Sequence, residues 1–144
     1  MSEAPILIFS GALALVFGLA IGSFLNVVIW RVPAGKSVVS PPSSCTSCGT
    51  PIAPRDNVPV LSWLLLRGRC RNCEIRISAR YPVVEAVTGI AFVLVTVGAF
   101  AGVYPFAFAL PLLYFVTMSI ALALIDLDTH TLPNKIVLPS YSFV

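Results

Sequence analysis

The sequence predicts an all-α polytopic membrane protein with a small zinc-ribbon-like cytoplasmic insert. Three observations lead to this fold class: the composition, three long apolar segments, and two Cys-x-x-Cys pairs. Of the 144 residues, 58% are hydrophobic and only 10% are charged, whereas a soluble domain carries about 25% charged residues. The composition therefore disfavours a water-soluble domain, and the formal net charge of +3 gives no indication of a nucleic-acid partner.

Residues 1–30 contain the first predicted transmembrane helix. No charged residue lies between Ala4 and Trp30, and a helix needs about 20 apolar residues to cross a bilayer. A cleaved signal peptide is the less favoured interpretation, because no basic residue precedes the apolar run and the run is long for such a peptide.

Residues 83–126 are predicted to form a transmembrane helical hairpin. The first arm, 83–101, carries one charge, Glu85, and the second arm, 106–125, carries none. Only residues 102–105 separate the two arms, so the connection must be a tight turn. Helices are expected in lipid because each helix satisfies its own backbone hydrogen bonds.

Residues 31–82 form a basic loop that holds all four cysteines. The spacing of the two pairs is typical of tetrahedral structural zinc, whose four thiolates leave no open coordination position. A redox pair or unliganded thiols are the alternatives. Gly49 is expected at positive φ, and residues 58–66 are expected to form small strands. The predicted zinc ligands are Cys45, Cys48, Cys70 and Cys73.

The basic residues predict the orientation in the bilayer. Eight of the nine Lys and Arg residues lie between Arg31 and Arg80, and short basic loops stay on the cytoplasmic side of a membrane. We therefore expect the cysteine-containing loop on the cytoplasmic face of the inner (plasma) membrane. The hairpin then returns Asp126 to the same face.

Asp126 follows directly on the last apolar run, so we expect it at or just inside the membrane interface, where ionisable groups are costly and often functional. Acid-catalysed peptide hydrolysis needs two carboxyl groups that share a proton. Asp128 is a poor partner, because residues i and i+2 of a helix point in different directions. The plainer interpretation is that both acids mark a helix end, and that His130 is a surface or capping residue.

Several residues inside the apolar segments have a packing or a binding interpretation. Gly18, Gly22 and Ser23 give the first helix a face of small residues that favours close helix packing. Asn26 needs a hydrogen-bond partner at its depth, and ligand binding is the alternative. Glu85 is interpreted as an interfacial group, with a binding carboxylate as the alternative.

Four motifs in this order resemble the bacterial type IV prepilin peptidase family, whose members are prepilin leader peptidases and N-methyltransferases. The resemblance covers nearly the whole chain. The motifs are residues 22–33 (GSFLNVVIWRVP), 56–63 (DNVPVLSW) with 66–70 (LRGRC), 77–85 (ISARYPVVE) with Thr88 and Gly89, and 126–134 (DLDTHTLPN).

The resemblance implies a membrane aspartyl peptidase that cleaves the leader of type IV prepilins and pseudopilins. It further implies that the enzyme methylates the new N-terminus with S-adenosylmethionine. Asp126 matches the first of the family's two catalytic aspartates, and Asp128 has a weaker claim. The family's second aspartate lies in a Gly-x-Gly-Asp motif, and this sequence contains no Gly-x-Gly.

We therefore expect residues 127–144 to begin a truncated aspartyl peptidase module, and this chain alone to be incomplete for peptidase activity. The alternatives are a non-proteolytic remnant that only methylates, and a membrane scaffold whose zinc loop docks a partner. The sequence leaves open a homo-oligomer, the identity of the pilin substrate and the place of S-adenosylmethionine.

Overall fold

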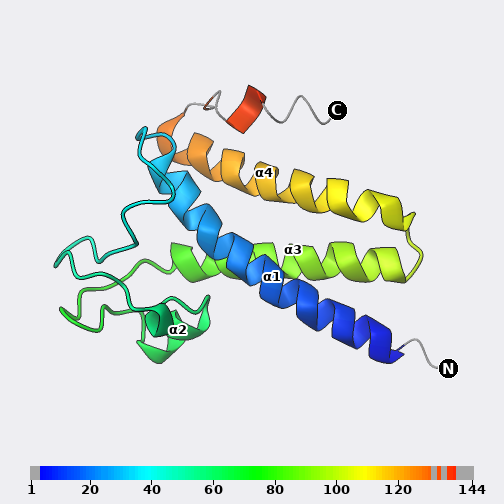
Figure 1. Ribbon diagram of the computed structural model, residues 1–144, viewed down its shortest axis with the longest axis horizontal. Coiled ribbons are helices and arrows are strands. Elements are labelled where there is room, and N and C mark those ends of the chain that lie inside the picture. The colour runs from blue at the N-terminus through cyan, green and yellow to red at the C-terminus, as the bar shows by residue number, and fades with distance from the viewer. Residues whose placement is uncertain (1–3, 131–132, 134–135, 139–144) are drawn as a thin grey trace.

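Three long helices dominate the computed structural model of the chain, which describes residues 4–130, 133 and 136–138. They are α1 (Ala4–Arg31), α3 (Arg80–Phe100) and α4 (Ala109–Thr129), the last preceded by the 3₁₀ turn η2 (Phe106–Phe108). Each is long and apolar enough to cross a membrane. Figure 1 shows α3 and α4 running side by side, with α1 crossing them at an angle. The predicted all-helical multi-pass fold is confirmed.

A stripe of small residues lets α1 approach α3 closely. A Cβ atom added at Gly22 would lie 2.6 Å from Glu85 Cα, and one added at Gly18 would lie 2.8 Å from Gly89 Cα. Close backbone approach of this kind is how apolar helices associate in lipid, where no hydrophobic force draws them together. The side of α1 that packs in the bundle also includes larger residues. The buried residues of α1 are Gly11, Ala14, Gly18, Gly22, Leu25 and Ile29.

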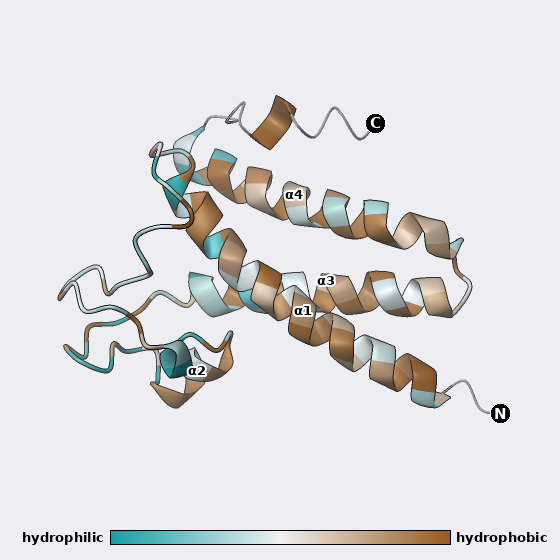
Figure 2. Cartoon of the chain, viewed as in Figure 1, coloured by the Kyte–Doolittle hydropathy of each residue, from teal (hydrophilic) through white to brown (hydrophobic). Residues whose placement is uncertain are grey.

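The core lies at the end of the bundle where α1 finishes and α3 begins. Its residues come from all three long helices and are Leu25, Ile29, Val84, Ala121 and Ile125. Elsewhere the long helices expose large apolar side chains, and Figure 2 shows hydrophobic residues along their whole length. Phe9 is 72% exposed and Leu110 is 77% exposed. This outward apolar surface is what a bilayer requires.

A short turn that begins with Ala101 and Gly102 joins α3 to η2 and α4. Gly102 takes the left-handed conformation, with φ +72°, which glycine adopts without steric cost. The Tyr104 hydroxyl donates a hydrogen bond to the carbonyl of Val95. Phe100 and Phe106 pack edge to face across the turn, with ring centroids 5.4 Å apart.

The loop between α1 and α3, residues 32–79, is hereafter the cysteine loop. It contains the 3₁₀ turn η1 (Pro54–Asp56) and the short helix α2 (Leu61–Leu65). Among the described residues, the only β-bridges are two isolated antiparallel ones, which pair Ser44 with Pro51 and Arg69 with Arg76.

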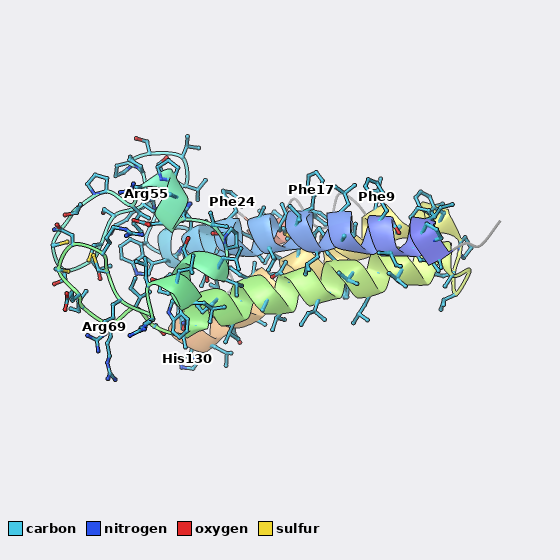
Figure 3. The ribbon with its side chains drawn as sticks, turned by 90° about the horizontal axis from the view of Figure 1, so that it is seen from below. Phe9, Phe17, Phe24, Arg55, Arg69 and His130 are labelled. Carbon is cyan, nitrogen blue, oxygen red and sulfur yellow. The ribbon has the colours of Figure 1, made fainter. Side chains whose placement is uncertain are left out.

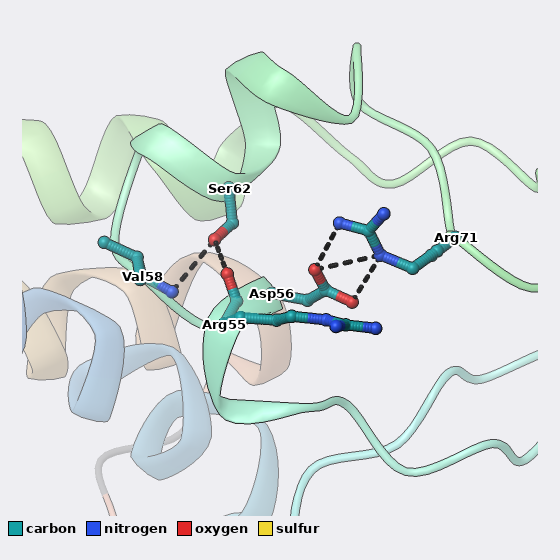
Figure 4. A network of polar contacts seen from close by, with 5 residues as sticks. All are labelled: Arg55, Asp56, Val58, Ser62 and Arg71. Carbon is teal, nitrogen blue, oxygen red and sulfur yellow. Dashed lines mark hydrogen bonds and ion pairs between the residues drawn. The ribbon is translucent and has the colours of Figure 1, made fainter.

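The prediction of small strands over residues 58–66 is wrong. Val60 has φ 61° and ψ −50°, and the Leu61 N–H donates to Pro59 O at 2.6 Å, so the chain reverses in a γ-turn and continues as α2. The Ser62 hydroxyl closes the turn, because it accepts a hydrogen bond from the Val58 N–H (3.0 Å) and donates one to Arg55 O (3.1 Å) (Figure 4).

Candidate metal centre and acidic site

The two Cys-x-x-Cys pairs form knuckles of the same geometry. In each knuckle, the backbone N–H of the first cysteine donates to the carbonyl of the residue five positions later. The carbonyl of the same cysteine accepts a hydrogen bond from the N–H of the residue four positions later. The residue after the second cysteine has positive φ, 70° at Gly49 and 57° at Glu74. The prediction for Gly49 is confirmed. The hydrogen bonds join Cys45 to Thr50 and Gly49 (3.0 and 2.9 Å), and Cys70 to Ile75 and Glu74 (2.9 and 3.0 Å).

The knuckles bring all four thiol groups together. Their Sγ atoms lie within 4.8 Å of one another, and the Sγ atoms of Cys45 and Cys73 are 3.7 Å apart. A Zn–S bond of about 2.3 Å places the sulfurs of a tetrahedral site roughly 3.8 Å apart. All four cysteines are free thiols. The geometry of the cluster therefore fits one tetrahedral ion.

The thiols differ in their acidity. The Thr50 hydroxyl lies 3.3 Å from Cys48 Sγ and is the main cause that lowers the pKa of Cys48 to about 6. Asn72 Nδ2 donates to Thr50 Oγ1 (3.0 Å), which leaves the hydroxyl proton free to point at sulfur. Backbone N–H groups of Cys73 and Asn72 lower the pKa of Cys70.

Cys73 is less acidic than Cys48 and Cys70. The backbone N–H of Ile75 favours its thiolate, but burial and the three neighbouring cysteines outweigh that bond and raise the pKa of Cys73 to about 11. A full set of four thiolates therefore requires a compensating cation, because each thiolate makes the next deprotonation harder. A divalent metal supplies that charge directly.

An ion pair ties the second knuckle to η1. Arg71 Nη2 lies 2.6 Å from Asp56 Oδ1, and Arg71 Nε lies 2.8 Å from Asp56 Oδ2 (Figure 4). This two-point contact fixes the geometry of both side chains. Hydrogen bonds from Arg71 hold the pKa of Asp56 below its usual range.

Glu85 joins the cysteine loop to the helical bundle. Its Oε2 atom accepts the N–H of Val60 at 2.7 Å, and the residue is only 9% exposed. The sequence left Glu85 as an interfacial or a binding carboxylate, and the structure gives it a partner inside the chain. Asn26 likewise finds one, because its Nδ2 atom donates to Tyr81 O at 3.1 Å.

The end of α4 lies at the same end of the bundle as the cysteine loop. Figure 3 shows His130, the C-cap of α4, at the end from which Arg55 and Arg69 project. His130 has φ 51° and donates its N–H to Asp126 O at 2.8 Å, which is the capping role expected of it. Residues 131–132 and 134, part of the fourth motif, lie outside the described residues.

The two acids near this end differ in their surroundings. Asp128 forms an ion pair with Arg80, whose Nη2 atom lies 2.7 Å from Asp128 Oδ2. Asp126 is exposed on the surface of α4 rather than packed among the helices. Its carboxylate makes no hydrogen bond or ion pair with the part of the chain that the structure describes. The two acids do not form a pair, as the i, i+2 spacing predicts.

Together these features define a multi-pass membrane protein that carries a cluster of four cysteines in the loop after its first span. The sequence profile of the bacterial peptidase A24 N-terminal domain matches residues 16–99, which include the second half of α1, the cysteine loop and nearly all of α3. The chain belongs to the prepilin peptidase A24 family, and the matched stretch is its N-terminal domain. The resemblance drawn from the four motifs is confirmed.

Named relatives agree with this family. A prepilin leader peptidase/N-methyltransferase of Myxococcus xanthus is 47% identical over 86% of this chain and 36% of its own length. A type 4 prepilin-like proteins leader peptide-processing enzyme of Escherichia coli is 43% identical over 85% of this chain and 51% of its own. A prepilin leader peptidase/N-methyltransferase of Neisseria gonorrhoeae is 37% identical over 96% of this chain and 56% of its own length.

The chain thus spans about half the length of the curated relatives it matches. No solved structure was found to match it.

Some residues that shape the site were not identified from the sequence. Thr50 and Asn72 lower the pKa of Cys48, and Arg80 forms the ion pair with Asp128. In each case the partner is distant in the sequence or is reached through a turn. Thr50 could have been found, since it occupies a fixed place two residues after the second cysteine of its knuckle. Arg80 lies 48 residues from Asp128, and only the packing of α3 on α4 reveals the pair.

Proposed function

We propose that this chain forms the first half of a membrane aspartyl peptidase that cleaves the leader of type IV prepilins and pseudopilins and N-methylates the new N-terminus. Family membership supports the class of reaction. One observation supports the choice of acid: Arg80 occupies Asp128 and leaves Asp126 unengaged at the end of α4. A carboxyl group that exchanges a proton with water and substrate is better placed when no arginine stabilises its ionised form.

In the proposed reaction, Asp126 is one of two carboxyl groups. One activates water as a general base, and the other donates a proton to the scissile carbonyl oxygen. The second carboxyl lies outside these 144 residues, which contain no Gly-x-Gly-Asp motif. S-adenosylmethionine is the proposed methyl donor. The proposed substrate face is cytoplasmic, because eight of nine basic residues lie in or beside the cysteine loop.

A chimera tests the role of Asp126. Residues 1–144 would replace the matching stretch of the Myxococcus xanthus relative, which supplies the rest of a peptidase. Asp126→Asn should reduce leader cleavage by about 10² to 10⁴-fold, the usual contribution of a general acid or base, while methylation of a pre-cut peptide persists. Asp128→Asn is the matched control and should retain cleavage. If Asp126→Asn still cleaves at the parental rate, Asp126 has no part in the chemistry.

We further propose that the four-cysteine cluster holds one structural zinc ion. Four thiolates complete the tetrahedron, so the ion stabilises the loop and offers no position to substrate. Purified protein should contain one zinc per chain by plasma mass spectrometry. Cys73→Ser should lose the metal, whereas Ser47→Ala, in the same loop, should keep it. Parent protein that carries no zinc after purification under reducing conditions contradicts the assignment.

The same two measurements separate the alternatives. A non-proteolytic remnant predicts a chimera that binds zinc and methylates but leaves the leader uncut, whichever residue stands at 126. A membrane scaffold predicts zinc without either activity.

A further inference from the structure

Helix α2 carries an apolar face that nothing else in the described chain covers. Leu61, Leu64 and Leu65 have the spacing i, i+3, i+4 and therefore share one side of the helix. They are 58%, 57% and 82% exposed. Figure 2 shows hydrophobic residues on this short helix.

The opposite side of α2 is fixed to the loop. Ser62 is buried and bonded to Arg55 O. The Trp63 indole lies on Gly68, where an added Cβ would be 2.8 Å from Trp63 Cζ2, and its Nε1 donates to Ile77 O at 3.1 Å. The leucines are therefore held outward by their neighbours, and they cannot turn inward without breaking these contacts.

The position of α2 along the bundle corresponds to the edge of a membrane. Val60, which precedes α2, donates its N–H to Glu85. Glu85 lies five residues into α3 from Arg80, about 7.5 Å along the helix axis at 1.5 Å per residue. Figure 1 shows α2 beside the first turns of α3, whereas both knuckles extend beyond the helix ends. The headgroup layer on each side of the hydrocarbon core is about 5–8 Å thick. If Arg80, at the start of α3, marks the outer edge of that layer, Glu85 and the neighbouring α2 lie within it.

Cations follow the apolar face directly. Arg67 and Arg69 come just after α2 and are exposed, and neither forms an ion pair within the described residues. Leucines that face the acyl chains beside arginines at the headgroup level are the arrangement of an interfacial membrane anchor. Basic groups near a membrane surface are further attracted by anionic lipids.

We propose that α2, through Leu61, Leu64 and Leu65, inserts into the headgroup layer of the bilayer, with Arg67 and Arg69 on anionic headgroups. The cysteine loop is then attached to the membrane through α1 and α3, which it connects, and also through this apolar face of α2. This attachment holds the metal centre at a fixed height beside the end of α4. The inference does not depend on peptidase activity.

Photocrosslinking in vesicles tests the proposal. The full chain, with p-benzoylphenylalanine in place of Leu65, is reconstituted in phosphatidylcholine alone and in phosphatidylcholine mixed with phosphatidylglycerol, then irradiated. Mass spectrometry should find lipid adducts in both, with more in the anionic mixture. The matched control is the same group at Ile75, which is 45% exposed but lies on the second knuckle, and it should give no lipid adduct.

Other outcomes overturn the proposal. Adducts at Leu65 with protein alone would show that a second copy or another segment covers α2. Equal lipid labelling at both positions, or none at Leu65, would place α2 away from the headgroup layer.

A second measurement does not rely on the probe. The double variant Leu64→Gln, Leu65→Gln should lose the protection of amides 61–66 against hydrogen exchange in vesicles, with circular dichroism as the check on folding. Unchanged exchange would contradict the proposal. Arg67→Gln with Arg69→Gln should instead remove only the difference between the two lipid mixtures.

Discussion

Single thiols in the cysteine loop are chemically unequal although they belong to two knuckles of the same shape. Cys48 and Cys73 are both exposed second cysteines of their pairs, yet the pKa of Cys48 is lowered to about 6 and that of Cys73 is raised to about 11. The difference comes from the side chains that contact each sulfur. Thr50 and Asn72 stabilise a thiolate at Cys48, while Cys73 faces the other three sulfurs.

This inequality predicts the order of alkylation in metal-free protein. The thiolate is the reactive form, so Cys48 should react with iodoacetamide at nearly its maximal rate at pH 7, one unit above its pKa. Cys73 should gain its full rate only as the pH rises through about 11. Site-resolved mass spectrometry over a pH series measures both midpoints.

Substitution of the neighbouring hydroxyl checks the cause. Thr50→Ala removes the strongest stabilising bond and should move the Cys48 midpoint to higher pH, whereas Ser47→Ala should leave it unchanged. Similar midpoints for Cys48 and Cys73 in the parent protein would contradict the assignment.

Among the helices, the contact between α1 and α3 depends on glycine at two positions. Gly18 and Gly22 lie where the backbones meet, and Gly11 lies further along α1 on the same face, where the helices diverge. A Cβ at Gly11 would meet Val97 Cγ2 at an ordinary 3.5 Å, whereas one at Gly22 would lie 2.6 Å from a backbone atom. The chain therefore offers a matched pair of glycines on one helix.

Alanine at Gly22 should destabilise the bundle by roughly 1–3 kcal/mol, the usual cost of overpacking a tight contact. Alanine at Gly11 should be neutral or stabilising by up to about 1 kcal/mol, because glycine is the weaker helix former. Equilibrium unfolding in mixed detergent micelles measures both. An equal change in the free energy of unfolding at the two positions would show that α1 does not pack closely against α3 at Glu85.

Elements with a local signal could be predicted from the sequence, and elements that depend on distant partners could not. Long apolar runs predict α1, α3 and α4, and the cysteine spacing predicts the cluster. The turn at Val60 has no such signal, because a β-branched residue at φ 61° is unfavourable by itself and accompanies a hydrogen bond to Glu85, 25 residues away. The ion pair of Arg80 with Asp128 likewise exists only once α3 and α4 pack.

Over the whole molecule, charge and chemistry are collected at one end. The cysteine loop, the Arg80–Asp128 ion pair and the end of α4 lie together there, as Figures 1 and 3 show. The turn at the other end, residues 102–105, carries no charged residue. The structure brings Asp126 to the end that holds the four-cysteine cluster, and the distribution of basic residues predicts which side of the membrane that end faces.

Labelling from outside intact bacteria tests this orientation on the whole chain. Val39, in the cysteine loop, is 86% exposed, and Val103, in the turn between α3 and α4, is 75% exposed. Because basic loops remain cytoplasmic, a membrane-impermeant maleimide should label Val103→Cys in intact cells with a permeable outer envelope. It should label Val39→Cys only after the inner membrane is opened. The parent protein gives the background of the native thiols, and the reverse pattern would invert the orientation and move Asp126 away from a cytoplasmic leader peptide.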